Sequence, residues 1–271
     1  MNERGPKAEL VSRGLRAKRQ FGQNFLADEN LCRRIAELVP EGASVVELGA
    51  GLGALTAPLL ERTQHLVAVE RDRDLIPILR ERFATDLGAG RLRVEEADAK
   101  AIDVKALLEG FPQPHVLAGN LPYQISGPLL KMAISLAAEL ERVVFLLQLE
   151  VAERLAAVAG SEHYGALSVF TQAAYGVSRA FVIRRGAFYP QPSVDSAVVV
   201  LTPRAGRVEE TPRFRALVRQ AFQSRRKKLR NAWDGLGDLA PAAARAGIDL
   251  DARGETLGVA AFARMEQELS R

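Results

Sequence analysis

The sequence is poor in the residues that bind metals and form disulfides. Its 271 residues include one cysteine, Cys32, and three histidines. A single cysteine excludes an intrachain disulfide and all but excludes a zinc site built from thiolates. His65, His115 and His163 are scattered over expected strand starts or a loop, without the spacing of metal ligands. We therefore expect no metal site.

Long apolar runs are also missing. A helix that crosses a bilayer needs about 20 consecutive apolar residues, and no stretch reaches that length. The first residues are polar and basic and lack the apolar centre of a secretory signal. The composition, 48% hydrophobic and 26% charged, is that of an ordinary globular protein. We expect a cytoplasmic protein that does not associate with a membrane.

The net charge of +4 is small but unevenly placed. Residues 1–22 hold six Lys/Arg against two Asp/Glu, and residues 205–271 hold thirteen against nine, so each end carries +4. The stretch between them holds eighteen against twenty-two, which gives −4. Such segregation favours a polyanion held by the basic ends, although two solvated surface faces would produce the same counts.

Short apolar runs alternate with helical patterns through most of the chain. Buried strands are expected at 43–48, 65–70, 91–94, 115–118 and 142–149. Helices are expected from Asp28 to 39, through 55–60, and at 75–83, 126–138, 151–158 and 166–174. This alternation predicts an α/β domain with a mostly parallel sheet and helices on both faces. Two late β-rich runs, 177–183 and 196–201, predict an antiparallel hairpin at one edge.

The chain is expected to form three parts. Residues 1–19 have little apolar periodicity, and we expect residues 1–22 to form a flexible basic arm. Residues 23–204 would form the catalytic domain. The stretch 202–212 contains two prolines and a glycine, so it is the best linker candidate. Beyond it only helical spacing appears, which predicts a small helical domain over 205–271.

A glycine-rich loop follows the first expected strand. Glycines between a strand and a helix let the backbone approach a ligand closely, and the helix points N–H groups at it. Glu70 lies 19 residues after Gly51, where an acid usually binds ribose hydroxyls. The spacing Gly49-x-Gly51-x-x-Ala54 also fits a loose dinucleotide fingerprint. The loop alone therefore fits an NAD enzyme and a methyltransferase equally well.

Three further features favour S-adenosylmethionine over NAD. Glu47 stands two residues before the first glycine, a pattern typical of enzymes that use S-adenosylmethionine. Asp98 follows the third strand, where such enzymes place an acid near the cofactor's adenine. The tetrad Asn120-Leu121-Pro122-Tyr123 directly follows the fourth strand.

The tetrad suits methyl transfer to an adenine amino group. N6 of adenine is a poor nucleophile because its lone pair is delocalised into the ring. The Asn120 side-chain oxygen and the following backbone carbonyl can each accept one N6 hydrogen bond, which localises the lone pair and aims it at a sulfonium methyl. Pro122 stiffens the turn, and Tyr123 offers a face on which a flipped-out base can stack.

Five motifs occur in a fixed order along the chain, at 18–26, 47–56, 120–123, 188–199 and 221–231. In this order they resemble the ribosomal RNA adenine dimethyltransferases, in particular the bacterial enzymes that act on 16S RNA. The resemblance runs from about Lys18 to the C-terminus. One departure is Ala50, where many members carry proline. The family implies a Rossmann-like methyltransferase sheet with a small all-α C-terminal domain.

The resemblance implies two groups of site residues. Those that bind the cofactor would be Asn24, Leu26, Gly49, Gly51, Glu70, Asp98 and Asn120. Those that act on the target adenine would be Asn120, Leu121, Pro122, Tyr123 and Phe188. In the first group, Asn24 and Leu26 would hold the methionine end. Without the resemblance, core packing would be the better interpretation of Phe188.

A run of cations near the C-terminus is the candidate RNA contact. It comprises Arg225, Arg226, Lys227, Lys228 and Arg230. We expect it on one helix whose apolar face includes Leu217, Ala221 and Leu229. At 100° per residue these charges cannot all face one way, so about three could touch phosphates together. A solvated helix face would explain the run as well, but the basic ends and the RNA substrate favour RNA contact.

The family implies a definite reaction and partner. S-adenosylmethionine would methylate N6 of two adjacent adenines near the 3′ end of 16S rRNA, twice each, within a pre-formed 30S particle, and the enzyme would act as a monomer. Two alternatives remain: a large-subunit rRNA dimethyltransferase of the antibiotic-resistance type, and a mainly non-catalytic ribosome-assembly factor. The basic C-terminal domain and the 188–199 motif favour the small-subunit enzyme.

Overall fold

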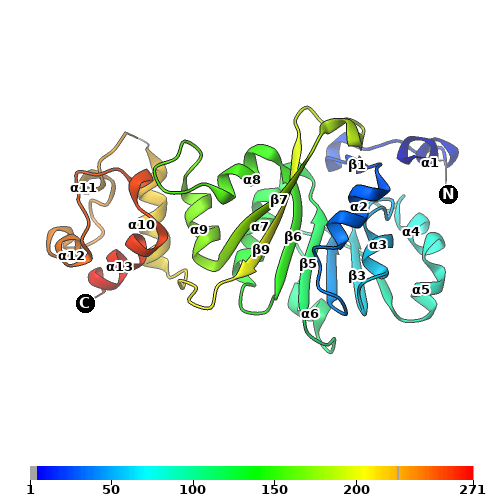
Figure 1. The fold of residues 1–271 in the computed structure, drawn as a ribbon, viewed down its shortest axis with the longest axis horizontal. Coiled ribbons are helices and arrows are strands. Elements are labelled where there is room, and N and C mark those ends of the chain that lie inside the picture. Colours follow the sequence, from blue (N-terminus) through cyan, green and yellow to red (C-terminus); the bar gives the residue numbers. More distant parts are fainter. Residues whose placement is uncertain (1–4, 225, 271) are drawn as a thin grey trace. The chain divides into compact units, whose positions relative to one another are not determined.

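Two compact units make up the chain (Figure 1), and the computed structural model describes residues 5–224 and 226–270. The sheet unit comprises the chain up to Ala152 together with Ser178–Thr202. The helical unit comprises Glu153–Val177 and the chain from Pro203 onward.

A seven-stranded sheet in the order β4-β3-β2-β5-β6-β9-β7 forms the centre of the sheet unit. Its strands are β2 (Ser44–Leu48), β3 (His65–Glu70), β4 (Leu92–Glu96), β5 (His115–Asn120), β6 (Arg142–Gln148), β7 (Tyr175–Ile183) and β9 (Ser196–Pro203). The first five are parallel, and β9 runs antiparallel to β6. The predicted α/β fold is therefore confirmed, and β9 and β7 are neighbours at one edge as expected.

Burial on both faces explains why the central strands read as nearly continuous apolar runs. Every residue of β2 is buried, and so are the five central residues of β6. The helices of the sheet unit are α2 (Glu29–Ala36), α3 (Thr56–Leu60), α4 (Ile76–Arg82), α5 (Ala84–Gly88), α6 (Val104–Leu108) and α7 (Ser126–Ser135). Helix α8 (Leu149–Ala156) begins in this unit and ends in the helical unit. Asp28 caps α2 as predicted, since its carboxylate accepts hydrogen bonds from the backbone N–H groups of Asn30 and Leu31.

The strand order reverses beside β2, because β3 lies on one side of it and β5 on the other. In open α/β sheets, ligands bind at the carboxyl ends of the strands at such a switch point. The all-parallel order of a dinucleotide-binding sheet does not continue here, because the antiparallel strand β9 lies next to β6. The topology thus points to the ends of β2 and β5, and it departs from the fold of an NAD enzyme.

The expected flexible arm over residues 1–22 is wrong for the part that the structure describes. Helix α1 (Pro6–Ser12) buries Leu10, and the short helix η1 (Arg19–Phe21) follows. Leu10 packs in a small cluster with Leu52, Leu75 and Ile78. The segment looks featureless in sequence because its partners are long-range contacts. Next, β1 (Phe25–Leu26) pairs with β8 (Phe188–Tyr189), which the short helix η3 (Arg185–Ala187) precedes.

The helical unit has its own core, and its boundary differs from the predicted one at 204/205. Its elements are α9 (Ala166–Ala174), α10 (Pro212–Gln223), α11 (Leu229–Ala232), α12 (Leu239–Ala246), η4 (Gly254–Thr256) and α13 (Val259–Leu269). Val169 and Ala173 of α9 pack in one buried cluster with Phe214 and Trp233. Helix α9 was expected in the catalytic domain, but this packing assigns residues 153–177 to the helical unit.

The basic run does not lie on a single helix, contrary to expectation. Helix α10 ends at Gln223, because Ser224 adopts an extended conformation, and α11 begins only at Leu229. Because of this break, Leu229 is buried in the core of the helical unit, whereas Arg226, Lys227 and Lys228 are exposed between the two helices. Arg225 lies outside the described residues. Within residues 5–224 and 226–270, every helix is too short or too polar to span a membrane.

Candidate active site

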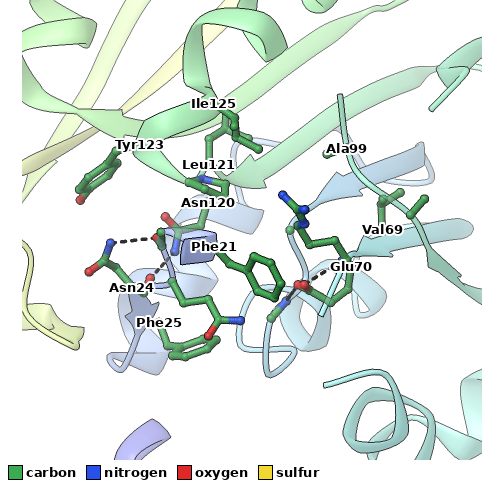
Figure 2. Close-up of a pocket in the computed structure, with 17 residues that line it drawn as sticks. Phe21, Asn24, Phe25, Val69, Glu70, Ala99, Asn120, Leu121, Tyr123 and Ile125 are labelled. Atoms are coloured by element: carbon green, nitrogen blue, oxygen red, sulfur yellow. Dashed lines mark hydrogen bonds between the residues drawn. The ribbon is translucent and has the colours of Figure 1, made fainter. Parts of the chain in front are cut away.

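A pocket opens at the carboxyl ends of β2, β3 and β5, as the topology predicts. It encloses about 650 Å³, part of it open to solvent. Its walls come from five segments: Phe21 to Phe25, the glycine loop, the end of β3, the segment after β4, and the tetrad at the end of β5. Figure 2 shows Tyr123, Asn24 and Asn120 toward one end and Glu70, Val69 and Ala99 toward the other.

The glycine loop forms one wall through backbone that only glycine adopts readily. Gly49 and Gly51 have φ of 78° and 58°, in the left-handed region. A Cβ at Gly51 would also stand 3.1 Å from the Phe25 ring. The loop therefore presents bare backbone to the pocket, as predicted.

Glu70 holds this loop while lining the pocket. One carboxylate oxygen accepts the Gly51 N–H at 2.8 Å, and the other accepts the N–H groups of Arg71 and Asp72, each at 2.8 Å. Burial raises the pKa of Glu70, and the three backbone hydrogen bonds oppose that rise. The oxygen that accepts from Gly51 retains a lone pair, so the carboxylate can also accept a hydroxyl from a ligand.

Glu47 lies beneath the loop and does not line the pocket. Its side chain is 1% exposed, and it accepts a hydrogen bond from the Thr56 hydroxyl at 2.6 Å. Burial raises the pKa of Glu47 to about 7, and the nearby Glu70 charge adds to the rise. The residue that helped to distinguish the cofactor therefore supports the loop from inside the core.

The tetrad brings the predicted catalytic residues to the pocket. Asn120 ends β5, and its side-chain N–H donates to the backbone carbonyl of Asn24 at 3.0 Å. This bond fixes the amide, so the Asn120 oxygen is the atom left to accept a ligand hydrogen. Leu121 and Pro122 line the pocket, and the Tyr123 hydroxyl is 2.6 Å from the Ser196 hydroxyl.

Three predicted site residues lie elsewhere. Leu26 and Phe188 are directly paired between β1 and β8, and both are buried in the core cluster. With 5% of its surface exposed, Phe188 has no face for a base in this arrangement, so its stacking role is unsupported and stays a prediction. Asp98 is not part of the pocket wall, although its neighbours Ala97 and Ala99 are. Its carboxylate stands 3.5 Å from the guanidinium of the pocket residue Arg71.

Several wall residues were not among those predicted from sequence, and Phe21 and Arg71 are two of them. The Arg71 guanidinium lies over the ring of Phe21, 4.6 Å from the ring centroid. Phe21 belongs to the 18–26 motif and Arg71 directly follows Glu70, so an aromatic inside a motif and a cation beside a ligand acid were the available signals. In the described part of the chain, no group of three or more His, Cys, Asp or Glu side chains could hold a metal ion.

The switch-point pocket, its bare backbone loop and the asparagine tetrad together define a Rossmann-like methyltransferase. A model of the family described as ribosomal RNA adenine dimethylase matches residues 14–271, and the chain belongs to this family.

Its relatives cover nearly the whole chain. Proteins named ribosomal RNA small subunit methyltransferase A from Anaeromyxobacter sp. (strain K) and Geobacter sulfurreducens are 44% and 41% identical to it. The alignments cover 97% and 94% of this chain, and 97% and 96% of theirs. A dimethyladenosine transferase from Plasmodium falciparum shares the fold, with a TM-score of 0.74 at 23% identity over 89% of this chain and 95% of that one. The structure of the 23S rRNA methyltransferase ErmE has a TM-score of 0.71 at 25% sequence identity. The match covers 92% of this chain and 100% of that one.

Proposed function

We propose that this protein transfers methyl groups from S-adenosylmethionine to N6 of two adjacent adenines near the 3′ end of 16S rRNA in the 30S particle, giving dimethyladenosines. Family membership supports adenine dimethylation of ribosomal RNA. The small-subunit target is supported by the relatives of 41–44% identity, whose name specifies that subunit. The protein would act in the cytoplasm as a monomer, in small-subunit maturation.

The residues that line the pocket fit S-adenosylmethionine in their chemistry. Gly49 and Gly51 present bare backbone with positive φ, a Cβ at Gly51 would crowd the Phe25 ring, and Glu70 offers a buried carboxylate beside them. Glu70 would hold the ribose hydroxyls, Asn24 the methionine end, and the segment around Asp98 the adenine. When bound, S-adenosylmethionine supplies an electrophilic methyl group on a sulfonium sulfur.

A single observation carries the assignment: the Asn120 amide faces the pocket while its N–H is held by the Asn24 carbonyl. A fixed amide presents its oxygen to an N6 hydrogen of adenine without any reorganisation. The Leu121 backbone carbonyl would accept the second N6 hydrogen, and the Tyr123 ring would stack on the base. The residues then act by positioning and electrostatics rather than by acid–base chemistry.

The large-subunit alternative is weaker on similarity. ErmE shares the fold but is 25% identical, whereas the relatives named for the small subunit reach 44% over 97% of the chain. The non-catalytic alternative would leave unexplained a pocket that holds both a fixed Asn120 and a buried Glu70.

Methylation of ribosomal particles tests the proposal. Labelled S-adenosylmethionine is supplied with unmethylated 30S particles or 23S rRNA, and the modified base is mapped by mass spectrometry. We expect dimethyladenine near the 3′ end of 16S rRNA. Asn120→Ala should bind cofactor only modestly less well yet lose about a hundredfold or more in methyl transfer, whereas the surface control Asn30→Ala should match wild type. Modified 23S rRNA, no product, or near-normal turnover of Asn120→Ala would each contradict the proposal.

A further inference from the structure

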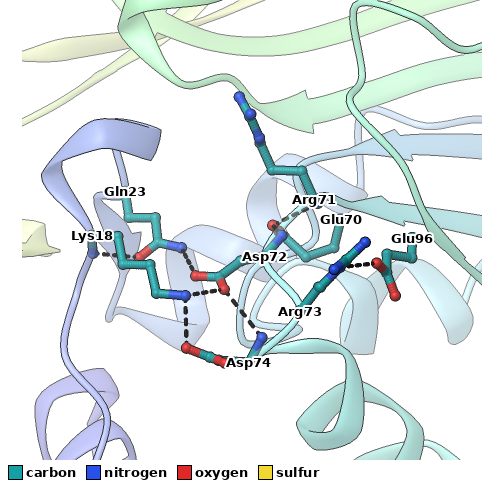
Figure 3. Close-up of polar contacts among 8 residues, drawn as sticks. All are labelled: Lys18, Gln23, Glu70, Arg71, Asp72, Arg73, Asp74 and Glu96. Atoms are coloured by element: carbon teal, nitrogen blue, oxygen red, sulfur yellow. Dashed lines mark hydrogen bonds and ion pairs between the residues drawn. The ribbon is translucent and has the colours of Figure 1, made fainter.

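Two segments far apart in sequence are joined by a polar network beside the pocket (Figure 3). One is residues 18–24, which run into the pocket wall. The other is residues 70–74, the turn that follows β3 and begins with Glu70. At the centre of the network is Asp72, whose side chain is 2% exposed.

Both oxygens of Asp72 are engaged. One accepts hydrogen bonds from the Lys18 ammonium at 2.5 Å and from the backbone N–H of Asp74 at 3.1 Å. The other accepts the Gln23 side-chain N–H at 2.7 Å. The Gln23 oxygen in turn accepts the backbone N–H of Lys18 at 2.7 Å, which closes a ring. Asp74 also pairs with Lys18 at 2.7 Å. These acceptors raise the pKa of Lys18, which keeps it charged.

The network fixes the residues on which the pocket depends. Between Lys18 and Gln23 the chain carries Phe21, which the Arg71 guanidinium covers. Directly after Gln23 comes Asn24, whose carbonyl holds the Asn120 amide. Gln23, which Asp72 holds, is therefore joined by a single peptide bond to Asn24, which orients the amide of Asn120.

We propose that Asp72 is a positioning residue for methyl transfer: by holding Gln23 and Lys18, it fixes the Asn24 carbonyl and, through it, the orientation of the Asn120 amide. This inference rests on the proposed function. Without the network, the Asn24 carbonyl loses its fixed place, and the Asn120 oxygen spends less time facing the target N6. Asp72 itself lies outside the pocket wall, so its effect on methyl transfer passes through Gln23 and Asn24, which line the wall.

Swapping the hydrogen-bond donor and acceptor between positions 72 and 23 distinguishes this positioning role from a general structural one. In Asp72→Asn, one of the two carboxylate oxygens becomes an NH₂ group. If that group faces Gln23, it meets the Gln23 NH₂ donor; if it faces the other way, it meets the donors of Lys18 and Asp74. In Gln23→Glu, the new carboxylate faces the Asp72 carboxylate. In the double variant the amide at position 72 donates to the carboxylate at position 23, and the amide oxygen still accepts from Lys18. All partners are then satisfied, and the total charge is unchanged.

The experiment measures single-turnover methyl transfer to 30S particles at saturating S-adenosylmethionine, with binding of S-adenosylhomocysteine used to count folded sites. We expect each single variant to slow the transfer tenfold to a hundredfold per folded site, and the double variant to return to within about threefold of wild type. Arg73→Gln is the matched control, because it breaks the ion pair to Glu96 on the same turn and leaves the network intact.

The result that would overturn the role of Asp72 differs from the result that would overturn the proposed function. If wild type transfers methyl groups and Asn120→Ala does not, but Asp72→Asn matches wild type, the positioning role is overturned and the function stands. A double variant as slow as the single ones also overturns it. A wild-type protein without transfer overturns the proposed function and this inference with it.

Discussion

At the residue scale, Glu70 both holds the glycine loop and lines the pocket. Its carboxylate accepts three backbone N–H groups and so shapes the glycine loop before any ligand arrives. The side chain also lines the pocket, where the proposed function puts the ribose hydroxyls. Under the proposed function, substitutions at Glu70 would act on binding through direct contacts and through loop geometry together.

We expect Glu70→Ala to weaken S-adenosylmethionine binding by about 1.5–3 kcal/mol, the scale of hydrogen bonds to a charged group. This corresponds to about a 10- to 150-fold rise in Kd, measured by titration calorimetry. The control is Glu96→Ala, which removes a more exposed acid at the end of the adjacent strand. Unchanged affinity in Glu70→Ala would refute the ribose role, and NAD binding to wild type would revive the dinucleotide alternative.

Glu47 predicts a pH dependence of stability. Its folded-state pKa, about 7, lies above the ordinary value of 4.5, so the folded protein holds the proton more tightly than the unfolded chain. Its contribution to the free energy of unfolding is therefore fully present below pH 4.5 and is lost as the pH rises through 7, by about 3 kcal/mol in all.

Glu47→Gln keeps an acceptor for Thr56 and removes the titration. Relative to wild type, this variant should gain stability as the pH rises from about 5 to about 8, measured by urea unfolding at each pH. Glu37→Gln, on the exposed surface, should follow the wild-type curve. A stability difference between Glu47→Gln and wild type that stays constant with pH would show that Glu47 does not titrate in this range.

At the element scale, the strands and most helices of the sheet unit could be predicted because local pattern and tertiary burial agree. Strand β3 and helix α9 both have the bounds that the sequence predicts. The structure of residues 6–21 could not be predicted, because Leu10 and Lys18 depend on partners more than forty residues away. The break after Gln223 was missed because Leu229 continues the apolar spacing of α10, although it packs from a separate helix.

The close packing of η4 against α10 predicts a glycine requirement in the helical unit. A Cβ at Gly254 would stand 2.7 Å from the Ala221 carbonyl oxygen and 2.8 Å from its Cβ. Gly254→Ala should therefore destabilise this unit by about 1–3 kcal/mol. Trp233, the only tryptophan, is fully buried in the same core, so its fluorescence reports the unfolding. Gly206→Ala, which meets no neighbour, is the control, and identical transitions would contradict the packing argument.

At the scale of the whole molecule, the site was more predictable than the surface that would bring RNA to it. Asn120, Tyr123, Gly51 and Glu70 meet in one pocket, as their places at strand ends predict. The role of Asn24 as the group that orients Asn120 could not be predicted, because it rests on a backbone carbonyl across 96 residues of sequence. On the basic run, Lys228 and Arg230 both pair with Asp251, which sequence spacing does not reveal.

The basic run should act on particle binding and not on the cofactor. Arg226→Ala with Lys227→Ala removes two exposed cations, which should weaken 30S binding and flatten the slope of log affinity against log salt by about 1.5. Affinity for S-adenosylmethionine should be unchanged, because the pocket is built from the sheet unit.

Arg213→Ala with Arg245→Ala provides the control for this pair. It removes the same charge from the same unit, at residues engaged with the C-terminal helix. A salt slope equal to that of wild type in the Arg226 and Lys227 variant would place the RNA contact elsewhere.

The helical unit is built partly from a segment inserted in the sheet unit and partly from the C-terminal part of the chain. This arrangement limits how the unit can be exchanged between related proteins. The chain enters this unit at Glu153, returns to the sheet unit at Ser178 and enters again at Pro203. A fragment that stops near residue 204 would keep α9 but leave Val169 and Ala173 without Phe214 and Trp233. Exchange of this unit between relatives therefore requires two matched junctions, and a single crossover near the linker should yield an aggregating chimaera.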